Sequence, residues 1–213
     1  MSASIENSRT ARTMRREPVQ ARSQQRVGLL LDTTANLVDE VGIEGVTTGL
    51  LAERAGVSIG SVYRFFPDRI SLMRALSDRN FQRYVDRFGA ASDNAQVDNW
   101  KDAVKVAIDQ FVSMHETEPG FRALRFGDVI DEQLLDGTTR SSGSVLGPFR
   151  ELLVEKLGVQ DTGLLMRQIG VATEICDGLL TRAFLQDKKG DEWLIDECRT
   201  VVCDYLDQRL QVA

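Results

Sequence analysis

The residues whose types and spacing predict the most specific chemistry lie between Thr47 and Arg69. A short apolar segment ends at Gly56, Ser58 follows the glycine, and a second short segment ends at Pro67. Glycine lets the chain reverse within a few residues, and a serine at position 58 can cap the following helix. We therefore predict two short helices joined by a tight turn, a helix-turn-helix whose second helix fits the major groove of DNA.

The second helix of this motif is predicted to present an outer face suited to DNA. With the apolar residues Leu51, Val57 and Val62 turned inward, its start is left outward, where free amides and the positive end of the helix dipole favour phosphate. Hydroxyl groups can bond a phosphate or a base edge, and apolar groups can touch a thymine methyl. The residues on this side are Ser58, Ile59, Gly60, Ser61, Tyr63, Arg64 and Phe65, with Arg69 placed to clamp a phosphate.

A competing interpretation comes from the same residues. The run from Gly56 to Gly60 matches the G-x-S-x-G elbow of serine hydrolases, in which Ser58 would be the nucleophile. That elbow needs a strand before it, whereas a helix is predicted there, and His115 is the single histidine available as a base. We therefore expect a protein that is not an enzyme.

Apolar spacing of three and four residues along the rest of the chain predicts helices, and no stretch has the period of a strand. The expected class is all-α, with a three-helix DNA-binding domain followed by a second helical domain. We divide the chain into an Arg-rich disordered arm (1–19), the helix-turn-helix domain (20–68) and the second helical domain (69–213). The expected helices cover 23–41, 47–55, 59–66, 69–88, 100–118, 121–127, 128–135, 145–157, 162–186 and 191–211, with loops at 89–99 and 136–144.

Charge is distributed unevenly along the chain. Residues 1–90 carry 13 basic residues, all Arg, and ten acidic ones, whereas residues 91–213 carry 13 basic and 22 acidic ones. The two parts thus have formal charges of +3 and −9, which suggests that the first part meets a polyanion. No apolar run is long enough to span a membrane and no secretory signal is present, so we expect a cytoplasmic protein with no membrane partner.

Apolar and polar residues of the second part could line a pocket for an apolar ligand. The candidates are Phe111, Met114, His115, Phe126, Met166 and Glu174, each of which could equally be ordinary core or surface. The three cysteines have no spacing typical of a metal site, since Cys198 and Cys203 point about 140° apart on a helix. We expect no metal site and no cofactor.

The motif closely resembles the DNA-binding domain of the tetracycline-repressor (TetR) family over about residues 23–75. The matching segments are Gly42-Ile-Glu-Gly45-Val-Thr47-Thr48, Leu51-Ala52-Glu-Arg-Ala55-Gly56-Val57-Ser58 and Tyr63-Arg-Phe-Phe66-Pro. Carried over by position, the resemblance implies DNA contacts from Thr48, Ser58, Ile59, Gly60, Ser61, Tyr63, Phe65 and Arg69, with Ser23 or Gln24 near the DNA backbone.

The resemblance also implies that residues 69–213 are a ligand-binding and dimerisation domain. It implies a homodimer whose last two helices form an intersubunit four-helix bundle, and a fourth helix that links a ligand pocket to the DNA-binding domain. The expected function is a ligand-responsive regulator, a repressor that binds a near-palindromic operator of double-stranded DNA and is released by a small-molecule effector. Gly49 stands where the family often has a polar base-reading residue, and Leu50 where the cap usually has a polar one. These departures keep open an alternative, a small-molecule sequestering protein with a weakened DNA-binding domain.

Overall fold

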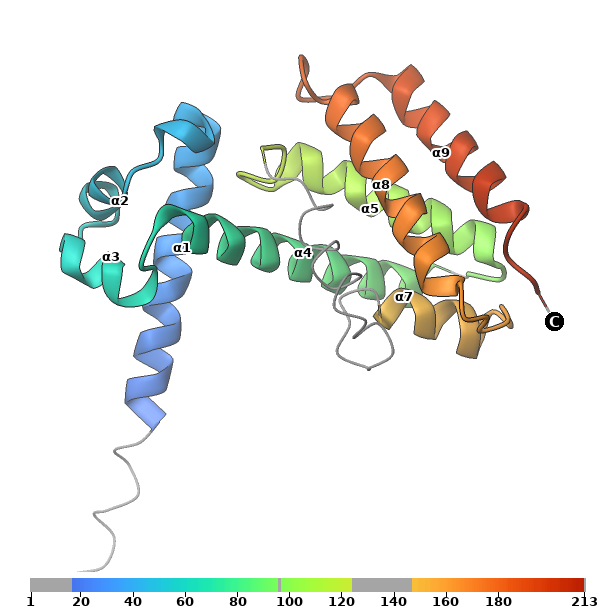
Figure 1. Ribbon diagram of the computed structural model, residues 1–213, viewed down its shortest axis with the longest axis horizontal. Helices are drawn as coiled ribbons and strands as arrows, with labels where there is room; N and C mark the ends of the chain where they lie inside the picture. Colours follow the sequence, from blue (N-terminus) through green and yellow to red (C-terminus); the bar gives the residue numbers. More distant parts are fainter. Residues whose placement is uncertain (1–16, 96, 124–146, 213) are drawn as a thin grey trace, which may run out of the picture.

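The computed structural model describes residues 17–95, 97–123 and 147–212, and over these residues the protein is helical (Figure 1). A single isolated β-bridge, between Val159 and Val212, is present within these ranges, so the predicted all-α class is confirmed there. Residues 1–16 of the predicted arm at 1–19 lie outside the described residues, as do Phe126, most of the helix at 121–127, the helix at 128–135 and the loop at 136–144. Residues 17–19, which were predicted to belong to the disordered arm, are helical, because a proline such as Pro18 is tolerated in the first turn of a helix.

The first domain packs three helices around a small apolar core. These are α1 (Glu17–Gly45), α2 (Thr48–Ala55) and α3 (Ile59–Phe65). Thr47 caps α2 by accepting a hydrogen bond from the Leu50 amide, which confirms the predicted start of that helix. Gly56 adopts the left-handed conformation (φ 64°, ψ 36°) that the tight turn requires, so the helix-turn-helix is confirmed.

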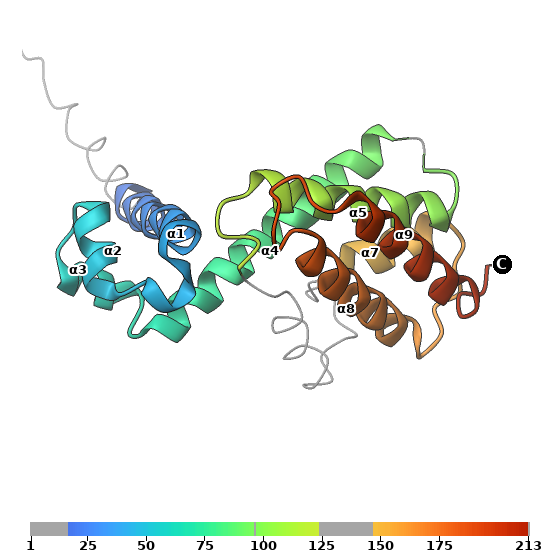
Figure 2. The ribbon, with the colours of Figure 1, turned by 90° about the horizontal axis from the view of Figure 1, so that it is seen from above.

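The fourth helix, α4 (Arg69–Asn94), runs from the first domain into the second (Figures 1 and 2). Its start is held by a reciprocal capping box between Asp68 and Ser71. It extends past the predicted end near residue 88, so the predicted loop at 89–99 was wrong over its first half. Ala90 and Ala91 are strong helix formers, and they carry the helix through Gly89 once the preceding turns are packed.

The second domain contains α5 (Trp100–Thr117), α7 (Gly147–Glu151), the π-helical turn η1 (Leu152–Lys156), α8 (Leu165–Ala183) and α9 (Glu192–Asp207). The uniform helix predicted for 145–157 was wrong, because its second half is π-helical. Both of the last helices are shorter than predicted. Gly158 and Gly190, each with positive φ, follow η1 and precede α9.

Two separate apolar cores result from this arrangement. The first domain's core includes Leu72 and Leu76 from the first turns of α4, and the second begins with Phe81. In the second, α8 and α9 pack against each other and α5 packs against α4 and α9. One continuous helix therefore contributes side chains to both cores.

Candidate functional site

The helix α3 buries one side and exposes the other. Val62 is fully buried, whereas Ile59 is 51% exposed and Tyr63 50% exposed. The Ser58 hydroxyl oxygen accepts a hydrogen bond from the Ser61 amide at 3.2 Å, which fixes the start of the helix and leaves the hydroxyl proton of Ser58 outside that bond. The side chains of Ile59 and Tyr63 are thus exposed to solvent on one side of α3, while the other side of the helix packs in the core.

A hydrogen bond between α2 and α3 orients Tyr63. Thr48 Oγ1 donates to the Tyr63 hydroxyl oxygen at 3.2 Å. Because a phenol has one proton and that proton is not used in this bond, the Tyr63 O–H can still donate to an outside acceptor such as a phosphate oxygen. Two of the predicted contact residues, one on each helix of the motif, therefore act together.

The arginines of this domain differ in what they contact. Arg69 donates to Glu44 Oε2 at 2.9 Å, and Arg54 contacts Glu40 at the same distance. Both pairs are exposed, where ion pairs contribute about 0–1 kcal/mol, so a phosphate could take the place of either carboxylate. Arg64, on the exposed side of α3, has no carboxylate within ion-pair distance among the described residues. It lies 6.0 Å from the Phe65 ring centroid and adds a cation that the family carry-over omitted.

Glycines on this surface leave room beside the backbone. A Cβ atom built at Gly60 would meet nothing within 4 Å, and one at Gly49 would meet the Thr47 hydroxyl alone, at 3.9 Å. The fold therefore does not require glycine at position 60.

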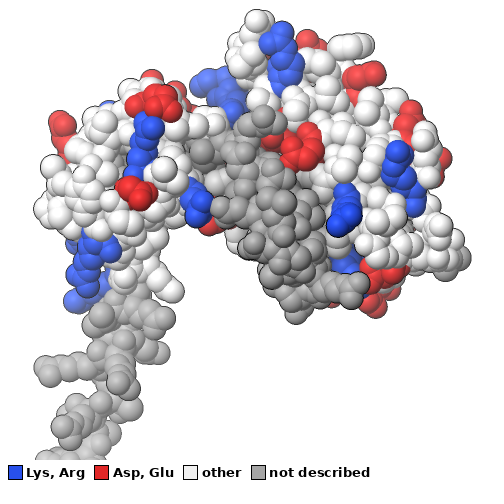
Figure 3. Space-filling view, viewed as in Figure 1, with Lys and Arg blue, Asp and Glu red and all other residues white. Residues whose placement is uncertain are grey.

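In Figure 3, basic side chains also gather on the lower edge of this domain, beside the first described turns of α1.

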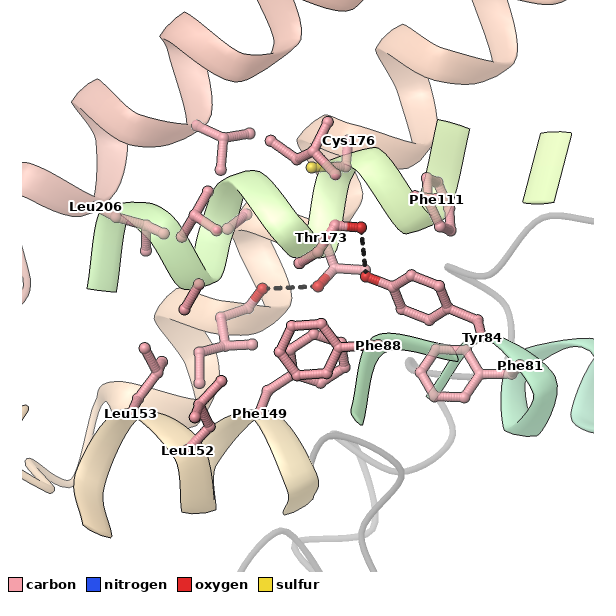
Figure 4. Close-up of a pocket in the computed structure, with 17 residues that line it drawn as sticks. Phe81, Tyr84, Phe88, Phe111, Phe149, Leu152, Leu153, Thr173, Cys176 and Leu206 are labelled. Atoms are coloured by element: carbon pink, nitrogen blue, oxygen red, sulfur yellow. Dashed lines mark hydrogen bonds between the residues drawn. The ribbon is translucent and has the colours of Figure 1, made fainter. Parts of the chain in front are cut away.

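A cavity of about 80 Å³ lies in the core of the second domain (Figure 4). A single buried water occupies roughly 10–15 Å³ by the same kind of measure, so the cavity can accept a small organic molecule. Helices α4, α5, α7, η1, α8 and α9 all contribute to its wall. Its aromatic lining residues are Phe81, Tyr84, Phe88, Phe111 and Phe149.

The predicted pocket residues are distributed around this cavity rather than gathered in it. Phe111 lines the cavity, whereas Met114 is fully buried beside it in the core. Met166 packs partly buried against the same core, and Glu174 is half-buried on α8; neither lines the cavity. The lining residues on α4 and η1 were missed, because the sequence shows an apolar helix face but not the space between faces.

His115 lies in an aromatic cluster next to the cavity. Its ring stacks on Phe184 at 4.8 Å between centroids and meets Phe121 and Phe111 edge-on. Its Nδ1 lies 2.9 Å from the Phe111 carbonyl oxygen. Burial lowers the pKa of His115 to about 4, because desolvation penalises the imidazolium, so the ring is neutral near pH 7.

Ion pairs join the residue after α5 to α4, and join α4 to α1. The Glu118 carboxylate, which is 6% exposed, contacts Arg83 and accepts a hydrogen bond from Arg87 at 2.9 Å. Asp32 on α1 contacts Arg79 at 2.7 Å and Arg83 at 3.4 Å. Arg83 therefore links a carboxylate of the first domain with one of the second.

The turn after α5 packs directly against α1. Gly120 has a φ of 72°, and its amide donates to Asp39 Oδ1 at 3.0 Å. A Cβ atom at Gly120 would lie 3.0 Å from the Ala35 Cα, which is tighter than nine in ten real contacts of a Cβ atom. The neighbouring Phe121 meets Phe111 at 5.4 Å between centroids, so a chain of contacts leads from the cavity wall to the DNA-binding domain.

Comparison with protein families identifies both domains. Residues 30–76 match the family model described as bacterial regulatory proteins, tetR family, and residues 98–210 match the model described as tetracyclin repressor-like, C-terminal domain. The second match alone covers more than half of the chain. The chain belongs to the TetR family.

Solved and curated TetR-family proteins extend this result. A TetR-family regulator from Streptomyces coelicolor is 34% identical with a TM-score of 0.73, over 89% of this chain and 99% of that one. The transcriptional repressor KstR of Rhodococcus jostii is 38% identical over 58 residues, 27% of each chain. The nucleoid occlusion factor SlmA of Glaesserella parasuis is 27% identical over 124 residues, 57% of this chain and 59% of that one. The chain thus spans between about a quarter and three fifths of these two curated relatives.

As a TetR-family protein, the chain is a transcriptional regulator with a DNA-binding helix-turn-helix and not an enzyme, as predicted. The hydrolase interpretation of Ser58 fails on structure as well, because the helix α2 and not a strand precedes it. Among the described helices, none combines the length and the apolar character that crossing a membrane demands.

Proposed function

We propose that the protein is a dimeric repressor that binds a near-palindromic operator in the cytoplasm and is released by a small molecule bound in the cavity of its second domain. The named repressor KstR, which shares the DNA-binding region, supports the repressor role. Two α3 helices related by a two-fold axis would enter successive major grooves about 34–36 Å apart.

The exposed side of α3 is the observation that carries the proposal. Ile59 and Tyr63 are half exposed there although the same helix buries Val62 completely. The side offers a methyl-rich group, a phenolic donor and the guanidinium of Arg64, which suit a thymine methyl and phosphate oxygens. We assign the contacts to the whole predicted set from Thr48 to Arg69 and add Arg64.

Exposed apolar residues on α8 and α9 support the dimer. Leu164, Val171 and Leu185 are 56%, 45% and 63% exposed, and Trp193 at the start of α9 is 69% exposed. Leu164 directly precedes α8 and Val171 lies seven residues further along it, whereas Leu185 follows the end of that helix. Exposed apolar residues of this kind, along a helix and at the ends of a helix pair, are suited to packing against a second subunit.

The proposed release depends on the contact between the domains. A ligand in the cavity would contact Tyr84 of α4 and Phe111 of α5. Arg83 of α4 pairs with Glu118 directly after α5, and the turn at Gly120 that follows packs against α1. The ligand weakens DNA binding only if it favours a conformation of these contacts different from the one that DNA favours.

The test of the function is a gel shift with the DNA that flanks the protein's own gene. We expect saturable binding that weakens steeply with salt, because phosphate contacts release counterions. The variant Tyr63→Ala should bind about 10-fold more weakly, and Val41→Ala, which trims an equally exposed residue of α1, should not. Absence of binding at low salt would favour the sequestering protein instead.

Sedimentation tests the dimer. At micromolar concentration we expect a species of about twice the chain mass of 23.7 kDa. Val171→Asp places a carboxylate in the proposed interface and should shift the protein toward the monomer, whereas Leu29→Asp, at a similarly exposed residue of α1, should not. A wild-type protein that sediments as a monomer throughout would contradict the dimer.

A further inference from the structure

We propose that the effector is a small uncharged molecule, apolar over most of its surface, that carries one hydrogen-bond-donating hydroxyl or N–H group directed at Thr173 and Tyr84. This inference rests on the proposed function only in treating the cavity as the effector site. The chemistry of the cavity wall determines the ligand class.

The described part of the wall carries no charged side chain. Among the residues that the structure describes, 17 line the cavity, and none of these is Lys, Arg, His, Asp or Glu. The lining side chains that carry a polar atom are Tyr84, Thr173 and Cys176. An ionised ligand would lose its hydration and find no opposite charge, which costs far more than any neutral contact returns.

The two hydroxyl groups define the direction of the hydrogen bond. Thr173 Oγ1 donates to the Ile169 carbonyl at 2.9 Å, and the Tyr84 hydroxyl donates to the Ala107 carbonyl at 3.1 Å (Figure 4). Each hydroxyl has a single proton, and each proton is used in these bonds. Burial also raises the pKa of Tyr84 well above its usual value, so the phenol keeps its proton. What each oxygen offers a ligand is a lone pair, and a lone pair binds a donor.

The rest of the cavity wall favours a ligand with an aromatic ring or a short apolar chain. Phe149 stacks on Phe88 at 4.1 Å and lies near-parallel to Tyr84 at 5.7 Å between centroids. Ala103, Ala107 and Ala172 leave space on the other sides. Apolar contact and aromatic packing with these groups would supply most of the affinity, and the donor group would supply orientation.

Three matched probes test the ligand class by titration calorimetry on the full-length protein without DNA. 4-Propylphenol has the donor, 4-propylanisole has the same ring with the donor methylated, and 4-propylbenzoate is an anion at pH 7. We expect the phenol to bind, the anisole to bind about 10-fold more weakly for one lost hydrogen bond, and the benzoate at least about 100-fold more weakly.

Two threonine variants locate the donor contact. Thr173→Val keeps the shape of the side chain but removes the acceptor oxygen, so the preference for phenol over anisole should fall from about 10-fold to about 3-fold or less. Thr200→Val is the matched control, because Thr200 on α9 makes the same bond to the carbonyl four residues earlier, to Asp196 at 3.1 Å, but outside the cavity. It should leave the preference unchanged.

The outcomes separate this inference from the proposed function. Equal binding of phenol and anisole, tighter binding of benzoate, or no binding of any probe would overturn the ligand class. If the phenol binds as expected but saturating phenol leaves the gel shift unchanged, the ligand class stands and release by the cavity fails. If the protein does not shift the DNA in the gel, the proposed regulatory function is contradicted, and the calorimetry remains a test of the ligand class.

Discussion

The two domains place their functional chemistry in opposite locations. In the first domain the interior is an apolar core, and the candidate contact groups Ile59, Tyr63 and Arg64 stand on the surface. The second domain lies in the net-acidic part of the sequence, and its candidate site is interior, a cavity bounded by Phe88, Phe111 and their neighbours. The exposed side of the first domain suits a large polyanion, and an apolar cavity suits a small neutral molecule.

The comparison also shows where the domains depend on each other. Helix α4 contributes to both cores, but the turn after α5 is the second connection, and it depends on one glycine that no side chain can replace without strain. Breaking that turn should therefore affect the whole chain, whereas changes within either functional surface should affect one activity.

The largest effect is expected for Gly120→Ala. The positive φ disfavours any side chain, and the new Cβ atom would press on Ala35 at 3.0–3.3 Å, so the free energy of unfolding should fall by about 2–4 kcal/mol. Gly158→Ala is the control, because Gly158 has a similar φ of 67° with nothing within 4 Å of its Cβ position, and should cost about 1 kcal/mol. Urea denaturation measures both. If both variants lose the same free energy of unfolding, the contact between Gly120 and α1 contributes nothing to stability.

The next effect concerns the second domain and acid. The unfolded chain protonates His115 near pH 6.5, whereas the folded chain does so near pH 4. Between these values the unfolded state binds more protons, so stability falls as pH falls through this window, by about 3 kcal/mol for this group, and is fully present above pH 6.5.

The variant His115→Phe removes this titration and keeps a ring between Phe184 and Phe121. The difference in melting temperature between wild type and variant should therefore change in favour of the variant from pH 7 to pH 4. A constant difference across that range would contradict the assigned pKa. The carboxylates titrate in both proteins and cancel in the comparison.

A smaller effect on DNA binding should come from the pair of Arg69 and Glu44. Arg69→Ala should weaken operator binding about 10-fold and reduce the steepness of its salt dependence. Glu44→Gln frees the guanidinium and should strengthen binding about 3-fold at low salt. Fluorescence anisotropy with labelled operator measures both. The assignment of Arg69 as a phosphate contact fails if the two variants change affinity in the same direction.

The smallest effect is expected at Gly60, where stability and function should move in opposite directions. Gly60→Ala fills open space in a helix and should stabilise the fold by about 0.5–1 kcal/mol. If the backbone of α3 approaches the DNA closely, the added methyl should weaken operator binding several-fold. Thermal unfolding and anisotropy of the same sample test this, and unchanged DNA affinity would argue against close approach.

Much of the first domain could be predicted from local sequence. Thr47, Gly56 and Ser58 each act within four residues of their own position, through a cap or a turn, and the structure places each in its predicted role. Local rules of this kind need no knowledge of distant partners.

The second domain shows why the rest was out of reach. The end of α4 near residue 88 was misjudged because helix length there depends on packing with other helices rather than on Gly89 alone. The π-helical turn at Leu152–Lys156 has no distinct sequence pattern. A cavity is the space left by six elements together, so a list of apolar residues identified Phe111 but not its companions on α4 and η1.

The chain's two tryptophans give the domain an optical property of its own. Trp100 is 8% exposed in the core, whereas Trp193 is 69% exposed on the face proposed for dimer contact. An indole in water emits at longer wavelength than one in an apolar surrounding, so dilution of the protein should redden its emission as subunits separate. Trp193→Phe would leave Trp100 as a fluorescent probe of the core alone. The intrinsic fluorescence of the unmodified protein can thus be used to follow its dimerisation.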